Sequence, residues 1–466
     1  MKVPAGLTAL SILAGADAAD TVLGTFMFHR HGDRTPKALA PTNLTALGYE
    51  QVYTSGQYYR SRYLSGASKI RGINEDTVKL SQLAVTAPVD NVLQNSAMGF
   101  LQGLYPPVQT LQTLANGESV SAPMDGYQLI PVNTIETGAG SEDAGWLQDA
   151  SSCANAKTSS NSFFESNEYK DLQSGTKELY ESVVPAVNGV IGADQVSFKN
   201  GYIVYDILNV ASIHNASTPS SPSNTTLTTL RTLADAHEWG LAYNASDPIR
   251  AVSGMQLAGE ILSSLRSTIS SKGSKPALSI QFGAYATFMS FFGLADLPAV
   301  NKDFTGVVGY ASSMVFELFT SADPSSGFPA TEDLKVRFLF HNGTASNSSE
   351  PTSYPLFGGQ STELSWTDFE TGLNKFAITS TQQWCEKCGN ATGSCAAYAQ
   401  KTGSTQSMAG KGGISPAIGG VIGAFVTLAV VLGTAAGVML VGGFTLVSKK
   451  KMAAKGAIGE NVEAKA

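Results

Sequence analysis

The sequence predicts a mixed α/β protein that carries an inserted, mainly helical domain and one C-terminal transmembrane helix. Short apolar runs alternate with segments of helical periodicity on either side of a central region. That region, from about 121 to 247, has long helical periods joined by loops rich in Ser, Thr, Asn and Pro. Residues 414–447 contain no charged residue and are numerous enough to cross a bilayer.

The N-terminus predicts a secretory signal peptide over residues 1–18 rather than a first core helix. Lys2 supplies the positive start, residues 7–13 are mostly apolar, and Ala16-Asp17-Ala18 fits a small-x-small cleavage site. The chain that follows is therefore expected outside the cytoplasm.

The first strand is predicted by the apolar run Val22–Phe28, which ends in a polar turn. Open α/β folds place their sites at the carboxyl ends of such strands. Arg30 and Arg34 in this turn suit a phosphate group, because planar guanidiniums bind its oxygens bidentately. The neutral imidazole of His31 is a nucleophile. The alternative is an exposed loop without chemistry.

The string Arg30-His31-Gly32-Asp33-Arg34-Thr35-Pro36 resembles the signature of the histidine acid phosphatases, the branch of the phosphoglycerate-mutase-like superfamily that includes phytases. The resemblance implies a three-layer α/β/α domain with a central, mostly parallel sheet. It also implies phosphomonoester hydrolysis without metal or cofactor. His31 would form a phosphohistidine while Arg30 and Arg34 hold the phosphate oxygens. His29 matches no functional position of the family.

The next segments extend the resemblance and then depart from it. Thr45–Leu64 predicts a helix, Val78–Val85 a strand and Val92–Leu104 a second helix. The last of these ends in Phe-Leu-Gln-Gly-Leu-Tyr-Pro-Pro, which resembles a family element. The family has its third phosphate arginine just before this helix, but residues 72–230 contain no arginine. One phosphate-binding arginine is therefore missing. Lys79 could replace it only if the fold places its side chain at the site.

The central region, 121–247, is expected to form an inserted helical domain similar to that of the family and to cover the site. Asn167–Val184 and Thr226–Tyr243 have helical periodicity. His237 and Glu238 lie inside the second pattern, whereas the family's histidine–acid pair follows a buried strand. We therefore interpret this pair as a solvated helix face rather than as part of a site.

After the insertion, Pro248–Leu265 predicts a helix, Ala277–Phe282 a strand and Tyr285–Leu294 another helix. The family has a His-Asp pair between that strand and helix, but this chain has no acid there. The family's proton donor is therefore absent from its expected position. Asp33, Asp90 or a carboxylate of the inserted domain are left as candidate acids.

Two further strands and four cysteines complete the exported part. Met314–Leu318 and Val336–Gly343 resemble the last strands of the family's sheet, with Glu317 in a structural role and His341 at the surface. An even number of cysteines in an oxidising compartment predicts two disulfides with three open pairings, rather than a redox pair or half a zinc site. The cysteines are Cys153, Cys385, Cys388 and Cys395. Glycosylation sequons occur at Asn43, Asn215, Asn224, Asn244, Asn342, Asn347 and Asn390.

The uncharged run is followed directly by Lys449-Lys450-Lys451, which predicts a cytoplasmic C-terminal tail. A cleaved lipid-anchor signal is the alternative, but such signals end in an apolar tail and this chain does not. We expect a single-pass membrane protein with its N-terminal part extracellular or lumenal. It would resemble a membrane-anchored, phytase-like fungal type of the family. The expected order is signal peptide 1–18, α/β domain 20–120 and 248–398, helical insertion 121–247, stalk 399–413, transmembrane helix 414–448 and cytoplasmic tail 449–466.

Two functions fit the sequence. One is an acid phosphatase of weak or narrow activity, because the nucleophile half of the site is intact and the proton-donor half is not. The other is a non-catalytic cell-surface glycoprotein that binds a phosphate ligand. The expected partner is a phosphomonoester or inorganic phosphate, and a net charge of −7 argues against nucleic acid. The substrate and the oligomeric state stay open.

Overall fold

The computed structural model describes residues 20–135, 152–215, 222–323 and 327–398. The predicted signal peptide, stalk, transmembrane helix and cytoplasmic tail lie outside the described residues. Among the described helices, none is both long and apolar enough to cross a membrane.

A single eight-stranded sheet runs through the α/β part, in the order β10-β8-β7-β1-β6-β2-β5 with β9 paired to β8. Strands β5, β2, β6 and β1 are parallel to one another, and antiparallel pairing begins at β7. This mixed sheet confirms the predicted α/β class. The strands are β1 Thr21–Arg30, β2 Leu83–Pro88, β5 Asn133–Ile135, β6 Leu278–Gly283, β7 Ser313–Thr320, β8 Leu334–His341, β9 Thr352–Ser353 and β10 Glu363–Ser365.

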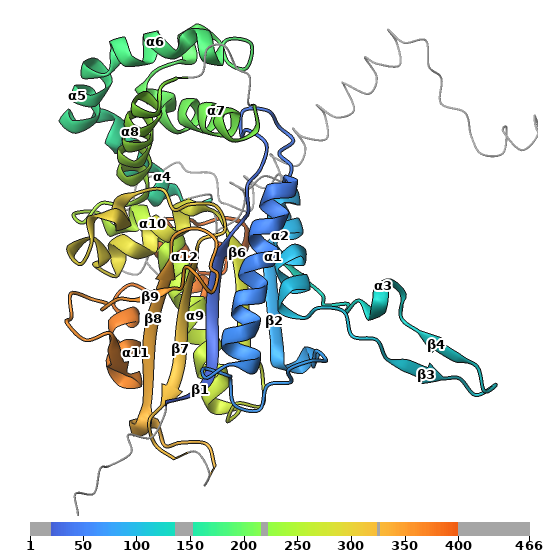
Figure 1. Cartoon of the computed structure of the whole chain (residues 1–466). Coiled ribbons are helices and arrows are strands. Elements are labelled where there is room, and N and C mark those ends of the chain that lie inside the picture. The colour runs from blue at the N-terminus through green and yellow to red at the C-terminus, as the bar shows by residue number, and fades with distance from the viewer. Residues whose placement is uncertain (1–19, 136–151, 216–221, 324–326, 399–466) are drawn as a thin grey trace, which may run out of the picture. The chain divides into compact units, whose positions relative to one another are not determined.

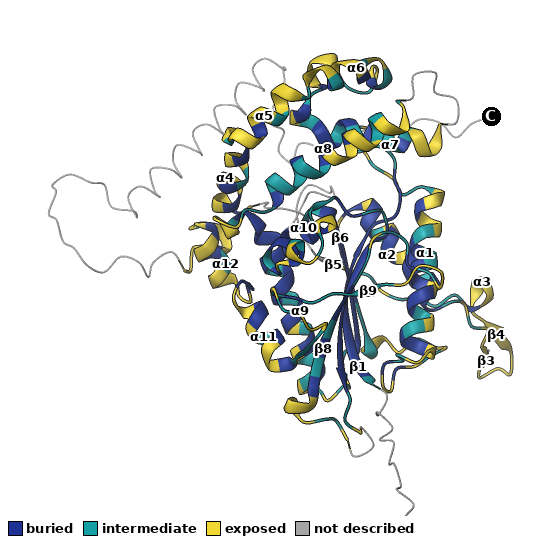
Figure 2. Cartoon of the chain, turned by 60° about the vertical axis from the view of Figure 1, so that its left-hand side comes forward, coloured by how far each residue is buried: buried dark blue, intermediate teal, exposed yellow. Residues whose placement is uncertain are grey.

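Helices cover both faces of this sheet. Side chains of a strand alternate between its two faces, and in β1 apolar side chains point to both. Met27 of β1 packs into the core beneath α1 and α2, whereas Phe26 and Phe28 pack into the core beneath α9, α10 and α11. Figure 2 shows the sheet as the buried layer between them. These helices are α1 Ala46–Arg60, α2 Asn91–Leu104, α9 Val252–Ser270, α10 Tyr285–Leu294 and α11 Trp366–Asn374.

A second group of helices has a hydrophobic core of its own, built on rings such as Phe163, Tyr169 and Phe198. The side chains of Ser166 and Ser223 cap α5 and α8, respectively, by accepting hydrogen bonds from backbone N–H groups in the first turn. In Figure 1 these helices lie beyond the end of β1. They are α4 Ala154–Ser162, α5 Asn167–Gly175, α6 Lys177–Val187, α7 Gly201–His214 and α8 Asn224–Ala242.

The two disulfides predicted from the cysteine count are present, and the fold decides their pairing. Cys153, at the start of α4, bonds to Cys388 in α12 (Thr381–Cys388). Cys385 bonds to Cys395, only 10 residues further along the chain. The first bond links the helical group to the C-terminal part of the α/β fold. A hairpin of β3 Leu111–Thr113 and β4 Ser119–Ser121, followed by α3 Pro123–Gly126, was not anticipated.

Two local predictions are corrected by the backbone. The strand expected from 78 begins at Leu83, because Leu80–Gln82 forms a 3₁₀ turn. Lys79 is exposed before this turn, at the end of β2 opposite to Pro88, so it does not replace the missing arginine. His341 is half-buried rather than at the open surface, which lowers its pKa.

Candidate active site

The Arg30–Pro36 loop begins where β1 ends, at the carboxyl edge of the parallel half of the sheet. β1 lies between β6 and β7, and Arg30 pairs with Gly283 at the end of β6. The ends of parallel strands form the usual site of an open α/β sheet. The sequence prediction of this position is therefore consistent with the fold.

Close packing against the start of α1 holds this loop in shape. A Cβ at Gly32 would lie 2.2 Å from the Gly48 carbonyl oxygen, and one at Gly48 would lie 2.0 Å from that of Asp33. The two glycines therefore allow backbones to meet that side chains would separate. The Thr45 N–H donates to the Asp33 carbonyl at 3.0 Å, and the Asp33 N–H donates to Gln51 at 2.8 Å.

His31 is fully buried, and one hydrogen bond fixes its tautomer. Its Nδ1 lies 2.8 Å from the Gly32 carbonyl oxygen. Because a carbonyl only accepts, Nδ1 carries the proton, and Nε2 is left with its lone pair in the neutral ring. That is the form in which imidazole acts as a nucleophile. By contrast, His29 packs against Phe100 and Phe282, and burial lowers its pKa to about 4.

Two tyrosines bring Arg30, His31 and Arg34 together. The Tyr310 ring lies 4.7 Å from the Arg30 guanidinium carbon, 6.0 Å from that of Arg34 and 5.6 Å from the His31 ring. The Tyr202 hydroxyl accepts from Arg30 Nη2 at 3.4 Å and from Arg34 Nη2 at 3.3 Å. Neither tyrosine was singled out by the sequence, because both come from segments far from the motif.

The two arginines differ in their counter-charges. Arg34 donates from Nη1 to both carboxylate oxygens of Asp206, at 3.0 and 3.1 Å, and both side chains are buried. Arg30 donates to the Val308 carbonyl and lies 5.2 Å from the Tyr285 ring centre. No carboxylate of the described chain forms an ion pair with it. A buried guanidinium without a counter-ion favours an anionic ligand.

The candidate acids Asp33 and Asp90 are both buried and both engaged. Asp33 Oδ1 accepts from the Thr45 hydroxyl at 2.6 Å and lies 2.6 Å from His214 Nε2, at the end of α7. Asp90 Oδ1 accepts from the Leu93 N–H at 2.9 Å and so caps α2. These contacts stabilise the loop and the helix.

The interpretation of His237 and Glu238 as a solvated helix face is wrong. His237 is buried among aromatic rings, and its Nδ1 lies 2.8 Å from Glu238 Oε1. Glu238 Oε2 accepts from the Tyr285 hydroxyl at 2.7 Å. Burial by itself would raise the pKa of Glu238, but the interactions with His237 and Tyr285 outweigh it and lower that pKa. Helical periodicity was visible in the sequence, but the packing partner of that helix face was not.

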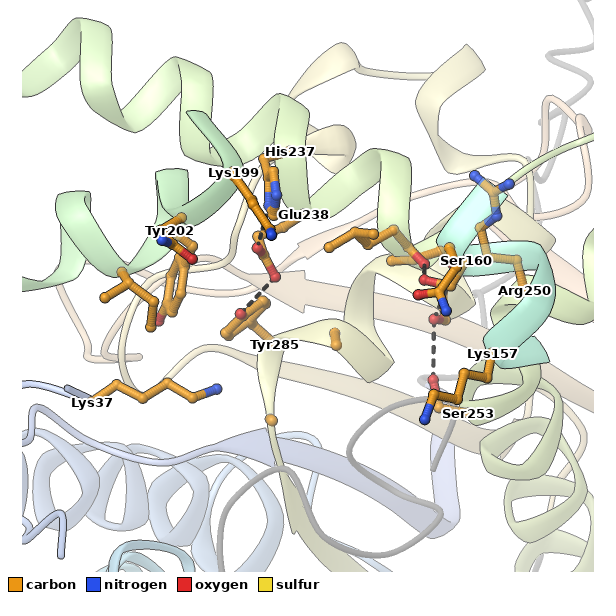
Figure 3. Close-up of a pocket in the computed structure, with 18 of the residues that line it drawn as sticks. Lys37, Lys157, Ser160, Lys199, Tyr202, His237, Glu238, Arg250, Ser253 and Tyr285 are labelled. Atoms are coloured by element: carbon orange, nitrogen blue, oxygen red, sulfur yellow. Dashed lines mark hydrogen bonds and ion pairs between the residues drawn. The ribbon is translucent and has the colours of Figure 1, made fainter. Parts of the chain in front are cut away.

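Glu238 borders a cavity of about 600 Å³ between the helical group and α10. Figure 3 shows the Tyr285–Glu238 hydrogen bond, with Tyr202 and the side chains of Lys37 and Lys199 beside it. Lys157 also lines the cavity. Tyr202 and Tyr285 both contact Arg30, so the cavity adjoins the motif. Three lysines around one cavity favour an anionic ligand.

The end of β6 carries no acid, and close packing leaves no room for a side chain at Gly283. A Cβ at Gly283 would lie 2.2 Å from the Phe28 ring. The next residues are Ala284 and Tyr285, which begin α10. The described residues hold no cluster of His, Cys, Asp or Glu suited to a metal ion.

One protein-family model and several curated proteins match parts of this chain. The family described as "Histidine phosphatase superfamily (branch 2)" matches residues 39–341. Human prostatic acid phosphatase is 29% identical over 200 residues, which cover 40% of this chain and 46% of that relative. The mouse protein is 30% identical over 226 residues, covering 45% and 53%, so the chain spans about half the length of the curated relatives it matches.

Solved structures show the same fold at low identity. The phytase of Citrobacter braakii has a TM-score of 0.51 and 14% identity, and the alignment covers 79% of this chain and 99% of that one. The phytase of Klebsiella sp. ASR1 has a TM-score of 0.52 and 12% identity, with 77% and 96% covered. At these identities the likeness concerns the fold.

Proposed function

The chain belongs to the histidine phosphatase superfamily, branch 2, and from that premise we propose that it hydrolyses phosphomonoesters through a phosphohistidine at His31. The observation that carries the proposal is that His31, Arg30 and Arg34, at the end of β1, all contact the ring of Tyr310. The matched relatives are acid phosphatases by name, which supports the same reaction class.

In the proposed first step, Nε2 of His31 attacks phosphorus and the ester oxygen leaves. The hydrogen bond from Nδ1 to the Gly32 carbonyl orients the ring and stabilises the positive charge that develops on it. Arg30 and Arg34 hold the phosphoryl oxygens, whose charge they stabilise in the transition state. Water then attacks the phosphohistidine, releasing phosphate and regenerating the neutral ring.

Proton donation to the leaving group is the weak part of this proposed site. Asp33 and Asp90 are held in structural contacts, and Glu238 faces the cavity with a lowered pKa. An ionised carboxylate is a poor acid, and loss of a general acid costs about 10²–10⁴ in rate. We therefore expect good leaving groups, such as phenolates, to be hydrolysed much faster than alkoxides.

A non-catalytic phosphate-binding protein is the second candidate. The specific observation in its favour is the acid-free end of β6 beside the buried Arg30, which has no carboxylate partner in the described chain. Such a site would retain the anion contacts without completing turnover.

An assay of the purified full-length chain near pH 5 separates these functions. Wild type and His31→Ala are compared on an aryl and an alkyl phosphate, and acid-labile phosphohistidine is trapped by rapid quench. We expect aryl phosphate hydrolysis that disappears in His31→Ala. Wild-type rates equal to those of the variant on both substrates would exclude the enzyme, and trapped phosphohistidine would exclude the binding-only function.

We also propose a single-pass membrane glycoprotein whose phosphatase part is extracellular or lumenal. The signal peptide, stalk, transmembrane helix and tail keep the boundaries stated above, but the helical insertion begins after β5, which pairs with β2 in the sheet, rather than at 121. The uncharged run 414–448 and the lysines that follow support the anchor. None of the seven sequon asparagines is buried, and two disulfides are present, which suits an oxidising compartment.

A further inference from the structure

We propose that Asp206 is an internal competitor for the phosphoryl group, a carboxylate that occupies part of the anion site and weakens phosphate binding at Arg34. The inference rests on the proposed function, because it concerns the affinity of that same site. Asp206 belongs to α7, in the helical group, and reaches the motif from outside the α/β fold.

The donors that Asp206 uses are those that suit a phosphate oxygen. Both of its oxygens accept from Arg34 Nη1, at 3.0 and 3.1 Å. Oδ2 also accepts from the Lys37 N–H at 2.7 Å, and Oδ1 lies 3.5 Å from the Tyr310 hydroxyl. A guanidinium and a backbone N–H next to a catalytic loop are typical phosphate donors.

Arg34 has other contacts that hold it in place. Its Nη1 donates to the Thr35 carbonyl at 3.0 Å, and its Nη2 donates to the Tyr202 hydroxyl at 3.3 Å. The position of the guanidinium is thus defined from two sides without the carboxylate. What Asp206 adds is a buried negative charge, since its side chain is 2% exposed.

There is room for a ligand next to this carboxylate. Asp206 and Arg30 border the same cavity of about 170 Å³, together with Asn209 and Arg231. An anion bound to Arg30 there would face the buried Asp206 carboxylate. Like charges juxtaposed in such a site oppose binding, and a bound phosphate would have to share or displace the contacts of Asp206.

Asp206→Asn tests this, since it removes the charge and keeps the shape. Inorganic phosphate affinity is measured by calorimetry on the full-length chain, and we expect it to rise about tenfold or more. Asp171→Asn is the control. Asp171 is exposed on α5 in the same helical group and does not line this cavity. The variant removes the same formal charge, and we expect its phosphate affinity to stay within about twofold of wild type.

If Asp206→Asn is less stable than wild type, phosphate binding can still be compared through the melting temperature. Without phosphate, Asp206→Asn lacks the buried Asp206–Arg34 ion pair and should melt below wild type. Added phosphate should raise the melting temperature of Asp206→Asn more than that of wild type or Asp171→Asn, because ligand binding stabilises the folded state. Asp206→Ser also lacks the carboxylate and should show the same larger rise in melting temperature with phosphate. If a variant folds only when phosphate is present in the medium, that dependence also supports the proposal.

An unchanged or weaker phosphate affinity in Asp206→Asn overturns the proposal, since it means that Asp206 only positions Arg34. If Asp206→Asn misfolds and added phosphate does not restore its folding, the proposal is overturned as well. Turnover of wild type and His31→Ala is measured in the same preparations. Absence of His31-dependent turnover would reject the phosphatase function, whereas absence of a gain in phosphate binding would reject the competitor.

Discussion

Among single residues, Tyr202 joins the two arginines of the site through its hydroxyl. Its hydroxyl accepts from Arg30 and from Arg34, and its ring lies 4.7 Å from that of Tyr285. Hydrogen bonds to charged donors are stronger than neutral ones. The hydroxyl therefore helps to keep the two guanidiniums at the spacing that a phosphoryl group needs.

We predict that Tyr202→Phe lowers kcat/KM for an aryl phosphate by about tenfold or more, because both arginines lose an acceptor of a charge-assisted hydrogen bond. Steady-state kinetics near pH 5 measure the effect. Tyr180→Phe is the control, since the buried Tyr180 hydroxyl has no hydrogen-bond partner in the described part of the chain. Equal activity in both variants would show that Tyr202 acts by packing alone.

His237 and Glu238 show how the meaning of a residue depends on its surroundings. Both lie in a helical pattern that by itself suggests a solvent-facing pair. In the fold, the His237 ring packs on the Phe198 ring at 5.4 Å, and Glu238 binds Tyr285 at the start of α10. The histidine is a core residue, and the carboxylate is a wall of the cavity.

At the scale of elements, the start of α1 shapes the motif loop. Thr45 caps the helix by accepting from the Gly48 N–H at 3.0 Å, and the same turn touches Gly32 and Asp33. The helix and the loop are thus one unit. In the sequence, only the family resemblance placed this helix next to the loop. In the structure, the two meet through close contacts between backbone atoms of Gly32, Asp33 and Gly48.

Gly48→Ala should push the start of α1 away from the Arg30–Pro36 loop, because the added methyl would lie 2.0 Å from the Asp33 carbonyl oxygen. We expect a loss of about 2–4 kcal/mol in the free energy of unfolding and a loss of His31-dependent turnover. Gly175→Ala is the matched control. Gly175 ends α5, and its added Cβ meets no atom within 4 Å, so that variant should be neutral or slightly stabilised. Denaturant unfolding decides, and equal stabilities of the two variants would refute the argument.

Helix α7 was not anticipated as an element, yet it carries Tyr202, Asp206 and His214 to the motif. Its sequence is strongly apolar, Tyr-Ile-Val-Tyr-Asp-Ile-Leu, with one acid in the middle. An aspartate inside such a run is costly to bury without a partner, and that was the available signal. The partner, Arg34, lies 172 residues away in the chain.

At the scale of the whole molecule, one experiment tests both the proposed glycosylation and the proposed membrane anchor. We predict that the full-length chain stays in the membrane pellet after alkaline carbonate extraction, and that endoglycosidase lowers its apparent mass. A chain ending at residue 413 should be released and should keep the same glycosidase shift. A full-length chain in the carbonate supernatant would contradict the anchor, and an unshifted mass would contradict the exported exterior.

Much of the fold followed from local patterns. The helix Tyr285–Leu294 has the predicted bounds, and β1, β6, β7 and α2 differ by a few residues at most. These elements are apolar on a clear period, so burial and local conformation favour the same structure. Short edge strands such as β5 and β10 carry no such pattern, and their pairing depends on their neighbours.

The sequence by itself determined the family signature, the Arg30–His31–Arg34 spacing, the presence of two disulfides and the lack of an acid after β6. Each of these is a property of neighbouring residues or of a count. The tertiary structure decided the disulfide pairing, the burial of His237, the contact of Glu238 with Tyr285, and the ion pair of Arg34 with Asp206. These are contacts between segments far apart in the chain, and charge and burial there depend on packing that no local pattern encodes.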